Sequence, residues 1–278
     1  MRTWLVTGGS KGLGAAIARK ALENGERVAI AARSVATASG LAAEFRETAL
    51  PVELDVTDIA SIGDAIRTVE DWAGPIHVLV NNAGQGLHGA IEETSDAELR
   101  RLFDVNVFGA ANVVRAVLPG MRSRRSGHIL NIGSVAGFVA NPGTGAYCAT
   151  KFALEALTEA LRKEVSGLGI RVTSAAPGGM RTAFNGSSIW QAALRISDYD
   201  GPVHDRIEDL RRHAGTRGSD VDAAAAAIWA LSMEPDPPSH LILGQDAIER
   251  IEQKLSLLNA QLAHADPLSP NTEDRSRK

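Results

Sequence analysis

Short apolar segments alternate with longer stretches of helical periodicity along most of the chain, and this alternation constrains the fold more than any other sequence feature. The apolar segments end at Gly, Pro, Asn or Asp and mostly lack apolar–polar alternation, which is typical of strands covered by helices on both faces. Seven segments are predicted as strands: residues 4–7, 27–31, 51–54, 77–81, 128–133, 171–175 and 240–243.

Helical periodicity is clearest in residues 14–24, 59–72, 96–118, 145–166 and 245–263. Strands that alternate with helices in this order predict right-handed crossovers. We therefore expect an α/β fold of the Rossmann type, with a doubly wound parallel sheet of about seven strands and helices on both faces. The last helix is expected to pack on the sheet or on another subunit.

The chain has 278 residues, of which 44% are hydrophobic and 22% charged. This is enough to bury the core of one large α/β domain, which we expect over residues 1–265. The segment from about residue 183 to about residue 217 lacks a long helical pattern. We predict that it covers the substrate; the alternative is an ordinary surface connection. The polar tail, residues 266–278, is predicted to be disordered.

Composition narrows the class of protein. The net charge of −4 gives no basic excess for binding nucleic acid. Cys148 is the only cysteine, so no intramolecular disulfide can form, which fits a reducing compartment. The first apolar run is too short for a signal peptide or a membrane span. We expect a cytoplasmic protein without membrane partners and, since no histidine has metal-ligand spacing with a partner, without a metal.

The first predicted strand leads directly into a glycine-rich turn, Thr7 to Gly14, and then into a helix. Glycine permits a tight turn and close approach of the backbone to a pyrophosphate, and the N-terminus of the helix favours phosphate. The spacing differs from G-x-G-x-x-G, yet its place between strand and helix favours a dinucleotide over a simple turn. The predicted cofactor contacts here are Gly8, Ser10, Lys11, Gly12, Leu13 and Gly14.

The end of the second predicted strand distinguishes the two nicotinamide cofactors. A carboxylate there would bind the ribose 2′-OH of NAD, but this chain has Arg33 and Ser34, which suit the 2′-phosphate of NADP. Lys11 can reach the same phosphate. We therefore predict NADP(H) rather than NAD(H). The alternative is that Arg33 and Lys11 are ordinary basic surface residues.

Two further strand exits lie at the carboxyl edge of the predicted sheet, where ligands bind in such folds. Asp55 and Val56 follow the third strand and are predicted to meet the adenine. Asn82, Ala83 and Gly84 follow the fourth strand and are predicted to contact the cofactor. Asn and Gly are also typical of any sharp strand exit, so that alternative stays open.

Candidate catalytic residues lie near the same edge. Tyr147 and Lys151 are four apart and share a helix face. A tyrosine acts as acid or base near neutral pH only if its pKa falls below about 10, and a neighbouring ammonium lowers it. Ser134 follows the fifth strand, where its hydroxyl can bind a substrate oxygen. Asn106 within a predicted helix indicates a kink or a bound water, or a bond to a backbone group in the core.

Together these motifs resemble the short-chain dehydrogenase/reductase family over about residues 3–250. The matching residues are Thr7-Gly8-x-x-x-Gly12-x-Gly14, Asp55, Asn81-Asn82-Ala83-Gly84, Asn106, Ser134, Tyr147-x-x-x-Lys151, and Pro177-Gly178 with Thr182. One departure is Gly133, where many members carry a serine.

The resemblance implies that Tyr147 protonates the carbonyl oxygen and that Ser134 polarises it. It implies that Lys151 lowers the Tyr147 pKa and holds the nicotinamide ribose, and that Asn106 supports a water in a proton relay. Tyr147 and Lys151 would also contact the cofactor. The loop expected to line the nicotinamide contains Pro177, Gly178, Met180 and Thr182.

These observations predict an NADP(H)-dependent oxidoreductase, a ketoreductase that transfers hydride between the nicotinamide and a ketone or secondary alcohol. One alternative is a catalytically idle NADP-binding sensor or scaffold. Another is epimerase or dehydratase chemistry on nucleotide-linked sugars, for which the chain after residue 180 is short. The substrate is expected to be a medium-sized, fairly apolar ketone or secondary alcohol, cyclic or steroid-like, near Phe138, Phe184, Ile189 and Trp190. The resemblance also implies a homodimer or homotetramer packed through helices 96–118 and 145–166.

Overall fold

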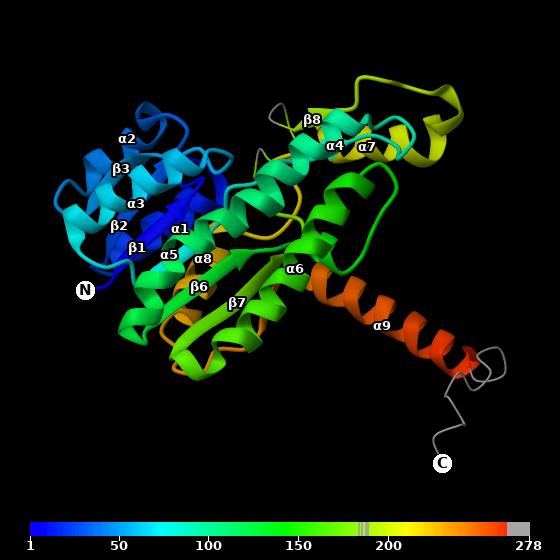
Figure 1. The fold of residues 1–278 in the computed structure, drawn as a ribbon. Helices are drawn as coiled ribbons and strands as arrows, with labels where there is room; N and C mark the ends of the chain where they lie inside the picture. The colour runs from blue at the N-terminus through cyan, green and yellow to red at the C-terminus, as the bar shows by residue number, and fades with distance from the viewer. Residues whose placement is uncertain (183, 185, 187–188, 266–278) are drawn as a thin grey trace, which may run out of the picture.

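All seven predicted strands belong to one parallel sheet with the order β3-β2-β1-β4-β6-β7-β9 (Figure 1). The computed structural model describes residues 1–182, 184, 186 and 189–265. The order reverses between β1 and β4, which creates a switch point at the carboxyl edge. The strands are β1 (Thr3–Thr7), β2 (Arg27–Ala32), β3 (Ala49–Glu53), β4 (Val78–Asn81), β6 (Gly127–Ile132), β7 (Ile170–Pro177) and β9 (His240–Leu243).

Helices cover both faces of the sheet. One apolar core lies between the sheet and α1 (Gly12–Glu23), α2 (Val35–Glu44) and α8 (Val221–Leu231). The other lies beneath α3 (Ile59–Ala73), α5 (Ala110–Arg124) and α6 (Gly145–Val165). Neighbouring residues of β1 show why the strands lack alternation, because Trp4 and Val6 face the first core and Leu5 the second. The predicted doubly wound α/β fold is confirmed.

The predicted helix over residues 96–118 is wrong as one continuous α-helix. It begins with α4 (Asp96–Phe103), widens into the π-helical turn η1 (Asp104–Gly109) and continues as α5. The distortion surrounds Asn106, whose side chain bonds the backbone of Gln85. Gly109 allows the turn to approach the strand exit, since a Cβ there would lie 2.8 Å from Val56 Cγ2.

The same helical run, Asp96–Arg124, is long and apolar enough to cross a membrane by length and composition, and 44% of its most apolar window is buried within the protein. Its apolar residues Val113, Val117 and Met121 pack in the core against the sheet. A core helix passes the same test of composition, so the run is weak evidence of a membrane span.

The segment after β7 contains more regular structure than its sequence indicated. Residues 183, 185 and 187–188 lie outside the described residues. Beyond them, β8 (Trp190–Gln191) pairs with β5 (Leu87–His88). Then follow η5 (Ser197–Tyr199), the π-helical turn η6 (Asp200–His204) and the short helix α7 (Asp205–Arg212).

The last helix, α9 (Gln245–Ala265), follows β9 and projects away from the sheet (Figure 1). Its first turn is fixed to the body by Ala247, which is fully buried, whereas Leu255, Leu258 and Leu262 farther along are exposed. Packing on the sheet is therefore limited to the start of this helix. The predicted disordered tail, residues 266–278, lies outside the described residues.

Candidate active site

The glycine-rich turn after β1 and the exit of β4 are bound together by polar contacts. The Thr7 hydroxyl accepts the backbone N–H groups of Asn82 and Ala83, each at 3.0 Å. In return the Asn82 amide donates to the carbonyls of Thr7 and Gly8 at 3.0 and 3.1 Å. Thr7 and Asn82 therefore fix the shape of this edge, a role that conventional turn preferences do not reveal.

Three glycines keep the turn open to a ligand. Gly8 and Gly12 adopt left-handed backbone conformations, with φ of 62° and 56°. A Cβ at Gly14 would overlap the Asn82 amide. Lys11 stands at the N-cap of α1 and its side chain makes no capping bond. The first turn of α1 thus offers backbone N–H groups and the positive end of its dipole, which fit a pyrophosphate.

Two basic residues, Lys11 and Arg33, follow the ends of β1 and β2. Arg33 and Lys11 are exposed, and among the described residues neither forms an ion pair. The nearby Asp55 carboxylate accepts the hydroxyl and the N–H of Thr57 at 2.7 and 2.9 Å. These bonds, helped by the charge of Arg33, hold the pKa of Asp55 below its usual value. Ser34 caps α2 without a side-chain bond to it.

Ser134 and Tyr147 meet at the carboxyl end of β6. Ser134 follows β6, and its Oγ accepts the N–H of Ala136 at 3.1 Å and lies 3.5 Å from the Pro177 carbonyl. Tyr147, in the first turn of α6, is half-buried. Burial raises the pKa of Tyr147, and a hydrogen bond with the Ser134 hydroxyl opposes this rise. The lowered Tyr147 pKa expected from Lys151 is therefore not found: burial leaves the pKa above its usual value, and the influence that lowers it comes from Ser134.

Lys151 lies one turn along α6 and is 6% exposed. Its Nζ donates to the Ile132 carbonyl at 2.7 Å and lies 5.8 Å from the centre of the Tyr147 ring. Burial lowers the pKa of Lys151 to about 8, and the charge of Glu155 acts in the opposite direction. The amine is therefore held at the end of β6, within electrostatic range of Tyr147.

Asn106 is joined to the loop after β4. Its Oδ1 accepts the Gln85 N–H and its Nδ2 donates to the Gln85 carbonyl, both at 2.8 Å. Nδ2 also donates to the Thr150 hydroxyl at 3.0 Å, which links η1 to α6. Of the alternatives raised by the sequence, the structure shows both the distorted helix and bonds to backbone groups. Gly84 lies between Asn106 and Lys151, since its Cβ would be 3.5 Å from Asn106 Oδ1 and 4.0 Å from Lys151 Nζ.

The loop after β7 completes the edge. The Gly179 N–H donates to the Asp246 carboxylate at 2.8 Å, and a Cβ at Gly178 would overlap that carboxylate. Met180 and Ser219 form a backbone bridge, and the residues that follow them, Arg181 and Asp220, form an ion pair at 2.6 Å. Thr182 then lies opposite Gly12, whose Cβ would be 3.8 Å from its methyl group. The loop thus faces the glycine-rich turn.

An apolar wall flanks the Tyr147 hydroxyl. The Phe184 and Tyr147 rings are 5.8 Å apart, and Trp190 packs with Tyr147 in a small cluster around Leu87. The Trp190 ring is held from outside by the Arg101 guanidinium, 4.0 Å from its centre. Phe138, expected in the same wall, packs edge-on against His240 at 5.5 Å.

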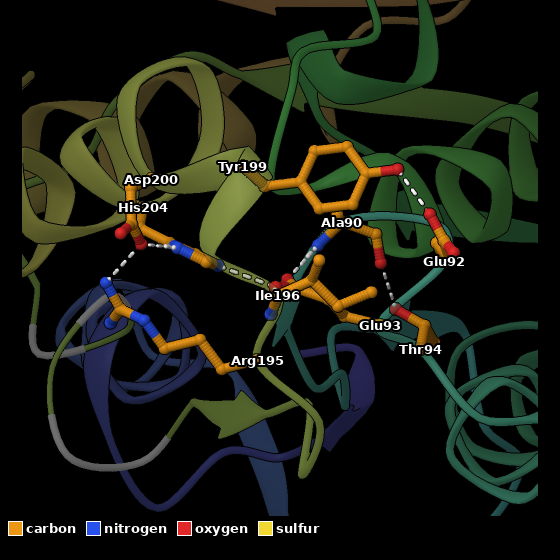
Figure 2. A network of polar contacts seen from close by, with 9 residues as sticks. All are labelled: Ala90, Glu92, Glu93, Thr94, Arg195, Ile196, Tyr199, Asp200 and His204. Carbon is orange, nitrogen blue, oxygen red and sulfur yellow. Dashed lines mark hydrogen bonds and ion pairs between the residues drawn. The ribbon is translucent and has the colours of Figure 1, made fainter.

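A network that the sequence did not indicate fastens the segment after β8 to the loop after β5 (Figure 2). Its centre is the buried Glu93, which accepts the N–H groups of Ala90 and Ile196 at 2.8 Å and the imidazole of His204 at 2.7 Å. Burial raises the pKa of Glu93, but these three bonds outweigh it and leave the pKa below its usual value. The outer ring of contacts comprises His204 with Asp200 at 2.7 Å, Arg195 with Asp200 at 2.7 Å and Tyr199 with Glu92 at 2.5 Å.

Comparisons with known proteins identify the family of this fold. The family model for short chain dehydrogenase matches residues 2–192. Oxidoreductase BOA17 of Botryotinia fuckeliana is 35% identical over 260 residues, which cover 93% of this chain and 94% of that protein. A short-chain dehydrogenase structure from Streptomyces avermitilis has a TM-score of 0.90 at 37% identity and covers 98% of both chains.

A third relative was solved with a cofactor derivative. The alcohol dehydrogenase from the archaeon Thermococcus sibiricus, complexed with 5-hydroxy-NADP, has a TM-score of 0.73 at 26% identity, covering 88% of this chain and 96% of that one. The extent of these matches, over a shared fold and most of each chain, establishes the family. The protein belongs to the short-chain dehydrogenases and is an oxidoreductase of that family.

Proposed function

We propose that the protein is an NADP(H)-dependent ketoreductase, which interconverts a ketone and a secondary alcohol with Tyr147 as the acid/base. The observation that carries this proposal is the meeting of the Ser134 and Tyr147 hydroxyls beside the buried Lys151 amine. A catalytically idle sensor or scaffold of this fold would have no need for such a set.

In the proposed reduction, a nicotinamide bound at this edge would supply the hydride that reduces the carbonyl carbon. The carbonyl π electrons move to oxygen, and the Ser134 hydroxyl donates a hydrogen bond to the negative charge that develops there. Tyr147 gives its proton to that oxygen and becomes a phenolate, which the Lys151 ammonium stabilises. The Tyr147 phenol is protonated at neutral pH, as an ordinary tyrosine is, and this is the form that reduction requires.

The cofactor preference is proposed from the chemistry beside the glycine-rich turn. The pyrophosphate would lie against Gly8, Gly12 and the first turn of α1, and the 2′-phosphate between Arg33 and Lys11. Arg33 directly follows β2, at the position where an NAD enzyme of this fold carries a carboxylate. The NADP derivative in the Thermococcus sibiricus relative supports the same choice.

The substrate is proposed to be a medium-sized, largely apolar molecule. Phe184, Ile189 and Trp190 lie near the Tyr147 side of the site, and Ile189 packs so close to Gly86 that a Cβ there would lie 2.6 Å from its Cδ1. Apolar walls with a few convergent polar groups are typical of small-molecule sites.

We also propose a homodimer or homotetramer packed through the helical run 96–124 and α6. The support is a set of large apolar side chains that these helices expose, Phe108, Phe152 and Leu157, which are 54%, 43% and 45% exposed. The cytoplasmic location remains a prediction.

The test is NADPH oxidation, followed by absorbance, with a panel of ketones and with the Tyr147→Phe variant. We expect wild-type turnover, and a loss of about 10²- to 10⁴-fold in kcat with unchanged NADPH affinity in the variant. Tyr199→Phe is the matched control, because Tyr199 is the only other tyrosine and its hydroxyl bonds Glu92. Full activity of Tyr147→Phe would overturn the catalytic role. NADPH binding without turnover on any ketone or alcohol would favour the sensor or scaffold.

A further inference from the structure

The face of α6 that carries Tyr147 and Lys151 continues to a third polar residue, Glu155. The three residues are spaced four apart and so follow one another along a single helix face. Glu155 is 8% exposed. Buried carboxylates are costly unless they are bonded or paired, and the proposed reaction makes no use of this one.

The Glu155 carboxylate joins α6 to two strands of the sheet. Its Oε1 accepts the Ser174 hydroxyl of β7 at 2.7 Å. Its Oε2 lies 3.5 Å from His240 Nε2 at the start of β9 and has no hydrogen-bond partner among the described residues. The charged groups that face the carboxylate are Lys151 on its own helix and His240 on β9.

Two glycines leave the space that this carboxylate occupies. A Cβ at Gly133 would overlap Glu155 Oε1 and lie 2.8 Å from the Ser174 hydroxyl. A Cβ at Gly137 would lie 2.8 Å from Glu155 Cγ. Gly133 stands directly between Ile132, whose carbonyl receives Lys151, and Ser134. The glycine that departs from the family pattern therefore makes room for Glu155 within the catalytic strand exit.

The two buried charges on α6 support one another. Burial lowers the pKa of Lys151 to about 8, and the Glu155 charge is the influence that raises it. Burial leaves the pKa of Glu155 above its usual value, although the Ser174 bond and the charges of His240 and Lys151 lower it. Each charge thus favours the ionised form of the other group, and both side chains are buried.

We propose that Glu155 is a positioning residue of the active site, whose carboxylate keeps Lys151 in its ammonium form from the side away from the substrate. Glu155 touches neither of the reacting hydroxyls and acts through Lys151. The effect of Glu155 on catalysis rests on the proposed reductase function. The effect of Glu155 on the protonation of Lys151 is independent of that function.

The first experiment measures Lys151 directly in the full chain. Lysine labelled with ¹³C at Cε is titrated by NMR, and the Lys151 signal is assigned by its loss in Lys151→Arg. In Glu155→Gln, which keeps the shape and the acceptor for Ser174, we expect the Lys151 midpoint to fall by about one pH unit. Glu159→Gln, one turn farther along α6 and exposed, should leave it unchanged. An unchanged midpoint in folded Glu155→Gln would overturn the proposal.

The second experiment measures the pH dependence of NADPH-driven reduction. Glu155→Gln should move the alkaline decline of kcat to lower pH by the same amount, with little change in KM, and Glu155→Asp should restore it in part. An equal loss of kcat at every pH would mean a structural role only and would contradict the proposal.

If Glu155→Gln fails to fold, Ser174→Ala provides a second test. It removes the hydroxyl that holds the Glu155 carboxylate and should give a smaller shift in the same direction; no shift would count against the proposal. If the Lys151 midpoint shifts in Glu155→Gln but the wild-type protein reduces no ketone, the effect of Glu155 on Lys151 is confirmed and the reductase function is refuted.

Discussion

Glu93 and His204, which are 111 residues apart, meet through a 2.7 Å bond between a buried carboxylate and an imidazole (Figure 2). The other ring nitrogen of His204 lies 2.7 Å from the Asp200 carboxylate. The His204 imidazole thus lies between two carboxylates, those of Glu93 and Asp200. Because Glu93 also binds the N–H of Ile196, this pair holds the segment after β8 beside the apolar wall of the site.

The first prediction concerns that pair. His204→Ala should leave the buried Glu93 with its two backbone donors but without its side-chain donor, and lower the free energy of unfolding by about 1–3 kcal/mol. A looser covering segment should also raise KM for the ketone more than it lowers kcat. Urea unfolding and steady-state kinetics measure the two effects. His213→Ala, which removes a more exposed histidine paired with Asp209, should change both much less; equal effects of the two variants would contradict the assignment.

A second prediction separates the two nicotinamide cofactors. Arg33→Ala should weaken NADPH binding by about tenfold or more, since a charge-assisted bond to phosphate contributes about 1.5–3 kcal/mol. NADH binding should change little, because NADH has no 2′-phosphate. Fluorescence titration with each cofactor measures this. Arg46→Ala, an exposed arginine after α2, is the control. Wild-type protein that binds NADH as well as NADPH would contradict the predicted preference.

The sheet and the motif positions at its carboxyl edge could be predicted because the signals are local. An apolar run such as β1 or β4 predicts a strand that is buried on both faces. The spacing of Tyr147 and Lys151, four residues apart, predicts that they share one face of a helix. Strand limits differed from the predictions by at most two residues, whereas the helix predicted over residues 96–118 is interrupted by a π-helical turn and ends at Arg124. The catalytic and cofactor roles of these residues remain proposals that rest on their geometry.

The features that escaped prediction depend on contacts between distant residues. The π-helical turn at Asn106 is held by Gln85 and Thr150, which are 21 and 44 residues away. The hydrogen bonds of Glu93 join the loop after β5 to Ile196 and His204, more than 100 residues farther along the chain, and no local pattern in either segment indicates this contact. Glu155 lies only one turn beyond Lys151, so its spacing was a usable signal, but its burial and its fit against Gly133 are visible only in three dimensions.

A third prediction tests that fit. Gly133→Ser would place a side chain into Glu155 Oε1 and should lower the free energy of unfolding by about 1–3 kcal/mol, as overpacking in a filled core does. Gly167→Ala is the matched control, because nothing lies within 4 Å of its Cβ position. We expect a change within about 0.5 kcal/mol there. Thermal and urea unfolding measure both, and a neutral Gly133→Ser would show that the carboxylate moves without cost.

A fourth prediction concerns Asn106. Asn106→Ala would remove the partner of the Gln85 N–H and carbonyl, and unsatisfied buried groups cost about 1–3 kcal/mol each. We expect lower stability together with lower kcat, because the loop after β4 and α6 lose their common support. Asn112→Ala, farther along the same helical run, removes only a bond from the exposed Arg115 and should have little effect on either. Wild-type kcat in Asn106→Ala would exclude Asn106 from the proposed site.

The pH dependence of reduction follows from Lys151. Its pKa is lowered by burial to about 8, so the ammonium is present below that pH and is lost as the pH rises through it. The ammonium stabilises the phenolate that Tyr147 becomes, so kcat should be level below about pH 8 and decline above it. Lys151→Arg keeps a positive charge at every accessible pH and should abolish the decline, whatever its effect on the absolute rate. A decline that persists unchanged in Lys151→Arg would assign it to another group. A wild-type profile level to pH 10 would show that the ammonium form of Lys151 is not needed.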